Sequence, residues 1–135
     1  MEPIRVFLDT NVVLDYFTGR MRDHLAETLV SIGQTDSYRL VISILTAVNT
    51  LYIARKAYGN TSLTPFDFER LFEIAPMTVS GWDEAKNSVL SDFEDALQLS
   101  CAKSARCSLV ISRDNHFNGT SFPVFSPEDF VSRVI

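Results

Sequence analysis

Apolar positions along the chain form short runs of strand length that alternate with segments of helical periodicity. The first run covers residues 4–8 and stops at the polar trio Asp9-Thr10-Asn11, which predicts a buried strand that ends there. Residues 38–42 and residues 109–111 form two similar runs. Because helix-patterned segments separate these runs, we expect a parallel sheet that is buried on both faces.

Helical spacing of apolar residues predicts the helices between these strands. Residues 12–16 and 23–32 give two helices after the first strand, and Ser43 is a suitable cap for a helix after the second. From Phe93, apolar side chains recur at offsets 3, 4 and 8, with the small Ser100 at offset 7. This stripe is typical of an amphipathic helix that faces a core.

The remaining segments continue the alternation of strand and helix. Residues 64–73, which open on Thr-Pro, predict a short helix, residues 77–79 a strand and residues 81–89 another helix. Residues 123–125 predict a last strand before a typical helix start at residues 126–128. The predicted fold class is therefore α/β, with a central parallel sheet of four to five strands and helices on both faces.

Composition assigns these elements to a single globular domain. The 135 residues suit one domain over residues 1–135. Hydrophobic residues make up 46% and charged residues 21% of the chain, which excludes a disordered or collagen-like protein. The formal net charge of −5 disfavours a protein that holds nucleic acid through broad phosphate neutralisation.

The cysteine content and the lengths of the apolar stretches indicate the cellular compartment. Cys101 and Cys107 are too few for a disulfide framework, and the first residues lack the apolar run of a signal peptide. The longest uncharged stretch, residues 40–54, contains polar residues and is shorter than a membrane-spanning helix. We therefore expect a cytoplasmic protein that has no membrane segment.

Acidic residues gather where the predicted strands end. Asp9 follows the first strand, Asp114 lies just beyond residues 109–111, and Asp92 and Asp95 open the helix that leads to that strand. Ligands of open parallel sheets bind beyond the carboxyl ends of the strands. Carboxylates that share a cleft repel one another unless a cation neutralises them, and oxygen ligands favour Mg²⁺ or Mn²⁺.

Each of these acids also has a purely structural interpretation. Asp9 can cap the helix that starts near Asn11, and Asp92 can cap the long helix with Asp95 in its first turn. Asp114 can be a turn former. Only the combination of the acids favours a metal site for phosphate chemistry.

Other kinds of site find less support in the sequence. His24 and His116 are the only histidines, and they do not belong to a zinc-binding motif. The glycine-rich patterns of dinucleotide-binding and P-loop sites are missing, which excludes nucleotide-binding enzymes of those two kinds. Cys101 lies on the apolar stripe, so we expect it in the core rather than as a nucleophile.

Five segments together resemble the PIN domain family. They are Val6-Phe7-Leu8-Asp9-Thr10-Asn11-Val12, Ser43-Ile44-Leu45-Thr46, Phe93-Glu94-Asp95-Ala96-Leu97, Ile111-Ser112-Arg113-Asp114 and Phe125-Ser126-Pro127-Glu128. The resemblance covers almost the whole chain and implies a metal-dependent ribonuclease on a parallel sheet. It extends to the small VapC-type toxins of bacterial toxin-antitoxin pairs.

The resemblance also implies a set of site residues. Asp9, Asp95 and Asp114 match the family's acids, which are catalytic and bind Mg²⁺ or Mn²⁺. Asn11 and Ser112 match polar residues that assist.

One position departs from the family pattern. The family usually has Thr-x-x-Glu in the helix after the second strand, but this chain has Thr46-Ala47-Val48-Asn49. Asn49 brings no negative charge, so both metal affinity and basicity should fall. Asp92, three residues before Asp95, is the better substitute ligand, whereas Asp15 is expected on a solvated face.

Two functions remain open at this point. The first is a toxin-like endoribonuclease that acts on RNA, with Arg113 and Lys103 assisting, a small antitoxin as partner and a homodimer as the assembly. The alternative is a non-catalytic PIN-fold module that binds RNA or protein, which Asn49 favours. A receiver-like or phosphatase-like domain with a phosphorylated Asp9 is disfavoured, because Asp9-Thr10-Asn11 lacks the second acid of such motifs.

Overall fold

The computed structural model describes residues 2–22, 24–114, 117 and 119–134. The strands of the described chain are β1 (Ile4–Leu8), β2 (Tyr38–Ser43), β3 (Glu73–Ala75), β4 (Leu109–Ile111) and β5 (Val124–Phe125). The helices are α1 (Thr10–Thr18), α2 (Leu25–Gly33), α3 (Ile44–Tyr58), α4 (Pro65–Leu71), α5 (Val79–Lys86), α6 (Phe93–Ser104) and α7 (Pro127–Val134). The strands form one sheet in the order β3-β2-β1-β4-β5, and every pair is parallel.

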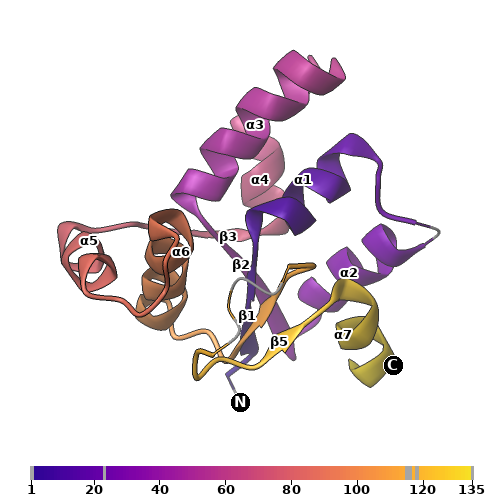
Figure 1. Ribbon diagram of the computed structural model, residues 1–135. Helices are drawn as coiled ribbons and strands as arrows, with labels where there is room; N and C mark the ends of the chain where they lie inside the picture. The colour runs from indigo at the N-terminus through magenta and orange to yellow at the C-terminus, as the bar shows by residue number, and fades with distance from the viewer. Residues whose placement is uncertain (1, 23, 115–116, 118, 135) are drawn as a thin grey trace.

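Alternation along the strands divides the apolar side chains between two cores. Val6 and Leu8 of β1 join a core that also contains Val12 of α1, whereas Phe7 faces a second core that contains Leu99 of α6. Figure 1 shows α5 and α6 on one side of the sheet, and α1, α2, α3, α4 and α7 on the other. The predicted α/β class, with a five-stranded parallel sheet and helices on both faces, is confirmed.

The strand order reverses at the centre of the sheet. The chain passes from β1 outward to β2 and β3, then returns to the opposite side of β1 with β4 and β5. Connections leave the carboxyl ends of β1 and β4 in opposite directions, which opens a crevice between those two ends. In Figure 1 this edge of the sheet lies where α1 and α3 begin.

Polar caps start the helices at this edge. Asp9 accepts a hydrogen bond from the Thr10 backbone N–H at 2.9 Å at the start of α1. Ser43 accepts from the Thr46 N–H at 3.0 Å at the start of α3. Each cap satisfies an N–H that the helix leaves without an internal partner. The structural interpretation of Asp9 as a cap is therefore correct, and the same residue stands at the crevice.

The middle of the chain differs from the sequence prediction. The strand predicted at residues 77–79 is wrong, because β3 covers Glu73–Ala75 and Thr78 caps α5 by accepting from the Gly81 N–H at 3.0 Å. Consequently α5 begins at Val79 rather than residue 81, and α4 ends at Leu71. The predicted helix at residues 23–32 is α2, although Asp23 lies outside the described residues.

The stripe on α6 is also only partly as predicted. Cys101 is buried, as expected, and burial raises the pKa of its thiol to about 11. It is protonated near neutral pH, which fits a core side chain rather than a nucleophile. Phe93 is 37% exposed and packs edge-on against Trp82, whereas the polar Gln98 is 1% exposed.

Among the described helices, none combines the length and the apolar character needed to cross a membrane.

The contact between α2 and β2 predicts a sensitive position at Gly33. A Cβ atom there would lie 2.5 Å from Cγ of the buried Leu40. We expect Gly33→Ala to lower the free energy of unfolding by about 1–3 kcal/mol, because the core has no room for the methyl group. Chemical denaturation checks this, with Ser31→Ala on the exposed side of α2 as the control. An unfolding free energy equal to or above that of the wild type would contradict the packing described.

Candidate functional site

Asp9 lies at the carboxyl end of β1, in the crevice beside β4. Its side chain is 6% exposed, and its Oδ2 accepts a hydrogen bond of 2.8 Å from the Ser112 hydroxyl. The Asp9 backbone N–H donates to the carbonyl of Ile111 at 3.0 Å. The ends of β1 and β4 are thus joined through both backbone and side chain.

Ser112 and Asn11 bring Asp114 to the same place. The Ser112 hydroxyl oxygen accepts from the Asp114 backbone N–H at 3.1 Å. The Asn11 amide of α1 donates to the Asp114 carboxylate. Asp9, Asn11, Ser112 and Asp114, which the sequence assigned to one site, therefore form one hydrogen-bonded group.

A second polar group, next to the first, joins side chains from three helices. The hydroxyls of Thr10 and Thr46 are 2.7 Å apart, and Gln98 Nε2 donates to them at 3.1 and 2.9 Å. Thr10 belongs to α1, Thr46 to α3 and Gln98 to α6. Sequence reasoning missed Gln98 because it lies outside the predicted apolar stripe, and its partners are 52 and 88 residues away.

Asn49 and Asp95 lie on two of the helices that this second group joins. Asn49 follows Thr46 by three residues on α3, and Asp95 precedes Gln98 by three residues on α6, so each lies about one helical turn from its partner on the same face. Because α3 leaves the sheet edge and α6 runs back toward the start of β4, both turns extend outward from the edge (Figure 1). Asn49 and Asp95 are both partly buried.

Asp92 has the structural role considered from the sequence. Its carboxylate accepts from the Asp95 N–H at 3.0 Å and caps α6. Asp92 is exposed, whereas Asp95 is partly buried. The cap fixes the first turn of α6, the turn that carries Asp95.

The charged residues around the site are ion-paired. Arg113 Nη1 donates to both carboxylate oxygens of Glu128 at 2.9 and 3.0 Å, and Arg113 Nε lies 3.5 Å from Asp15. Asp15 also pairs with Arg20 at 2.9 Å and is 18% exposed, so it is not on a solvated face as expected. These pairs connect α1, α7 and the turn that carries Asp114.

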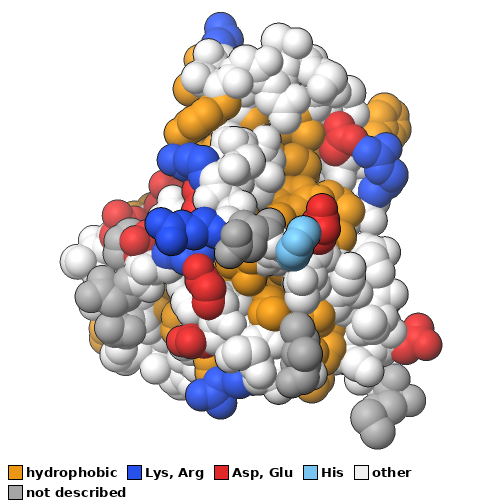
Figure 2. Space-filling view, turned by 90° about the vertical axis from the view of Figure 1, so that its right-hand side faces the viewer, with side chains coloured by type: hydrophobic (Ala, Val, Ile, Leu, Met, Phe, Trp, Pro, Cys, Tyr) orange, Lys and Arg blue, Asp and Glu red, His pale blue; other side chains and the backbone are white. Residues whose placement is uncertain are grey.

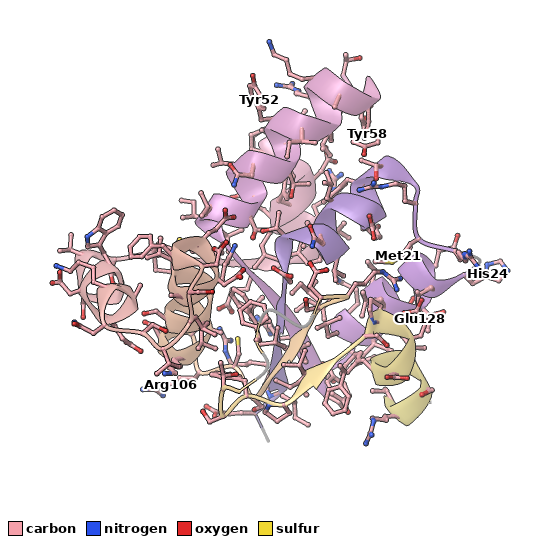
Figure 3. The ribbon with its side chains drawn as sticks, in the orientation of Figure 1. Met21, His24, Tyr52, Tyr58, Arg106 and Glu128 are labelled. Carbon is pink, nitrogen blue, oxygen red and sulfur yellow. The ribbon has the colours of Figure 1, made fainter. Side chains whose placement is uncertain are left out.

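Lys103 and the histidines lie elsewhere. Lys103 is in the last turn of α6 and pairs with Glu84 at 3.4 Å, roughly 12 Å along the helix axis from Asp95. His24 points outward beside α2 in Figure 3, and its side chain is 89% exposed. His116 lies outside the described residues.

The donor set at the crevice consists of oxygen atoms. Within the described ranges, no three His, Cys, Asp or Glu side chains are gathered closely enough to hold a metal ion. In donor type, however, the carboxylates of Asp9, Asp95 and Asp114 with the Asn49 carbonyl match a hard divalent cation such as Mg²⁺ or Mn²⁺. The residues therefore fit such an ion by their chemistry.

Comparison with known families identifies the domain. A family model described as "PIN domain" matches residues 5–116. The chain belongs to the PIN domain family. The match includes every acid and amide of the site, from Asp9 to Asp114.

Individual relatives of this PIN domain agree with the assignment. The chain is 25% identical over 142 residues to Ribonuclease VapC1 of Aquifex aeolicus (strain VF5), with 98% of this chain and 97% of the relative covered. A toxin-antitoxin complex from Klebsiella pneumoniae contains a similar fold, with a TM-score of 0.69, 20% identity, and coverage of 90% of this chain and 97% of that one. VapC20 of Mycobacterium tuberculosis, a toxin that cleaves the sarcin-ricin loop, gives a TM-score of 0.65 at 13% identity, with coverage of 87% and 95%.

The bond between Ser112 and Asp9 can be tested by substitution. In this PIN domain we expect Ser112→Ala to lower the free energy of unfolding by about 1.5–3 kcal/mol, because a buried carboxylate loses a hydrogen-bond donor. Thermal or urea unfolding measures the change, and Ser108→Ala, an exposed serine just before β4, is the control. Equal stability of the two variants would show that the hydroxyl does not hold Asp9.

Proposed function

We propose that this protein is a metal-dependent endoribonuclease of the VapC type. The observation that carries the proposal is the group at the crevice, where Ser112 and Asn11 bring the carboxylates of Asp9 and Asp114 together. Membership of the PIN domain family and the similarity to a VapC ribonuclease give this arrangement its chemical context.

The proposed metal ligands are Asp9, Asp95 and Asp114, with Asp92 as a further carboxylate at the start of α6. A bound Mg²⁺ or Mn²⁺ ion supplies Lewis acidity and lowers the pKa of a coordinated water. The protein's own contribution is to orient the carboxylates. Ser112 fixes one oxygen of Asp9, and Asn11 holds Asp114.

Asn49 alters the strength of the site rather than its layout. Its amide oxygen can accept a hydrogen bond from a metal-bound water, but the amide carries no charge. Cation affinity depends on the number of charged ligands. We therefore expect a weaker metal affinity and slower cleavage than a glutamate at this position would give.

An RNA substrate is compatible with an acidic protein when a cation lies between them. The chain has a formal net charge of −5, which would repel the phosphate backbone. A divalent ion held by the carboxylates would neutralise most of the local negative charge where a phosphodiester must approach. Arg113 is the nearest cationic side chain in sequence to the site, and in this structure it is paired with Glu128 and Asp15.

The exposed apolar surface suits protein partners. Ile44, Val48 and Tyr52 are 49%, 60% and 62% exposed and recur every four residues, so they form one stripe along α3. Figure 3 shows Tyr52 projecting from the outer half of α3, and hydrophobic side chains also lie between charged ones on the face drawn in Figure 2. We propose a homodimer through the α3 stripe and a small antitoxin as partner; the similar fold in a toxin-antitoxin complex from Klebsiella pneumoniae supports the second proposal.

A non-catalytic binding module is the second candidate. Asn49 favours it, because one carboxylate of the usual set is absent. The two functions make different demands on Asp9: a nuclease requires its charge, whereas a binding module loses little when that charge is removed.

Cleavage assays on matched variants separate these two functions. We expect the wild type to cleave single-stranded RNA in Mn²⁺, and Asp9→Asn to reduce cleavage to background because a buried ligand charge is lost. Asn49→Glu should bind Mn²⁺ about tenfold more tightly and cleave faster, because it adds a carboxylate. Calorimetry and a mixed RNA pool provide the two measurements, with a chelator as the control.

Two outcomes would count against the nuclease. Cleavage that survives Asp9→Asn would show that the catalytic site lies elsewhere or that the preparation is contaminated. Background cleavage by all three proteins in excess Mn²⁺ would favour the binding module.

A further inference from the structure

The buried amide of Gln98 lies where three elements of the site meet. Its Nε2 donates to Thr10 Oγ1 at 3.1 Å and to Thr46 Oγ1 at 2.9 Å. We refer to Thr10, Thr46 and Gln98 as the polar node. The node therefore joins α1, α3 and α6, which come from distant parts of the chain.

Each member of the node is adjacent to a proposed site residue. Thr10 lies between Asp9 and Asn11 in the sequence. Thr46 precedes Asn49 by one helical turn, and Gln98 follows Asp95 by one turn. Each member of the node thus lies within a single residue or a single helical turn of Asp9, Asn49 or Asp95.

The node is a poor device for stability alone. Gln98 is 1% exposed, and its Oε1 is buried without a hydrogen-bond partner among the described residues. The two threonine hydroxyls already lie 2.7 Å from each other. An apolar side chain of equal length at position 98 would avoid burying the unmatched amide oxygen, and the two threonine hydroxyls would keep each other as partners.

We propose that Gln98 is a positioning residue that sets the place of Asp95 relative to Asp9 and Asn49. This inference rests on the proposed nuclease function. Gln98 fixes the rotation and height of α6 through two hydrogen bonds to the elements that carry the other site residues. These two bonds are directional, unlike the apolar contacts that also hold α6 against the sheet. Groups behind metal ligands are worth about 10–100-fold in metal affinity or activity.

The test uses one near-isosteric series and one control. Gln98→Met keeps the length of the side chain and removes its polar atoms. Thr46→Val removes one partner hydroxyl, and Thr46→Ser retains it. Leu99→Val is the control, because Leu99 is the next residue on α6 and is buried in the core that contains Phe7. For each variant the experiment measures Mn²⁺ affinity, kcat and KM on single-stranded RNA, and the melting temperature without metal. A crystal structure of each variant is also determined.

We expect Gln98→Met and Thr46→Val to weaken Mn²⁺ binding and to lower kcat by about tenfold or more, with KM little changed. The melting temperature of Gln98→Met should remain close to that of the wild type, whereas that of Thr46→Val should fall, because Gln98 and Thr10 each lose a buried hydrogen-bond partner. Thr46→Ser should restore affinity and kcat. Leu99→Val should lower the melting temperature while Mn²⁺ affinity and kcat stay at the wild-type values. In crystals of Gln98→Met, the first two turns of α6 should be shifted relative to α1.

The opposite pattern overturns the proposal. If Gln98→Met lowers the melting temperature but leaves α6 in place and Mn²⁺ affinity and kcat unchanged, Gln98 is only a packing residue. If the wild type neither binds Mn²⁺ nor cleaves RNA, the proposed nuclease function fails. The crystal structures then decide the positioning role by themselves: a shifted α6 supports it, and an unshifted α6 refutes it.

Discussion

The hydrogen bond from the Ser112 hydroxyl to the Asp9 carboxylate depends on one constraint, the reversal of strand order beside β1. That reversal places the carboxyl ends of β1 and β4 next to each other while their connections leave in opposite directions. The residue after β1 and the residue after β4 consequently meet, although they are 103 positions apart. Asn11 and Asp114 complete the group from the same two strand ends.

Helices from both sides of the sheet extend the site. α3 begins at the end of β2, and α6 approaches from the opposite face. The cap by Asp92 fixes the start of α6, and the node around Gln98 fixes its second turn. Two independent sets of bonds therefore restrain the turn that carries Asp95. The uncharged side chain of Asn49 lowers the negative charge of the proposed site but leaves this framework intact.

The local sequence pattern was sufficient to predict the strands that are buried and the helices that have a clear capping residue. The central strands β1, β2 and β4 each contain at least three consecutive apolar residues, and Ser43 marks the start of α3 as its N-cap. The edge strand β3 was missed because Glu73 pairs with Arg5, a contact that a sequence does not reveal. That pairing lowers the pKa of Glu73, so the charged side chain is stabilised in a strand whose composition resembles a loop.

The same distinction applies to the candidate site. Asp9 was found because it directly follows β1, and Asp114 because it lies three residues beyond the end of β4, which are both local features. Gln98 and the ion pairs of Asp15 were not found, because their partners come from other elements and are specified only by the packing of helices. Sequence pattern thus identified the residues at strand ends, while tertiary contacts determine how they are held.

The most direct test of this account is where a divalent ion binds. In an NMR titration of ¹⁵N-labelled protein, Mn²⁺ broadens the signals of backbone amides close to the ion much more than those of distant amides. If Asp9, Asp95 and Asp114 bind the ion, the amides of Thr10, Asp95 and Ser112 should broaden first, before those around the acidic side chains of α5. Selective broadening around Asp83 and Glu84 on α5, with the signals at the ends of β1 and β4 unaffected, would contradict it.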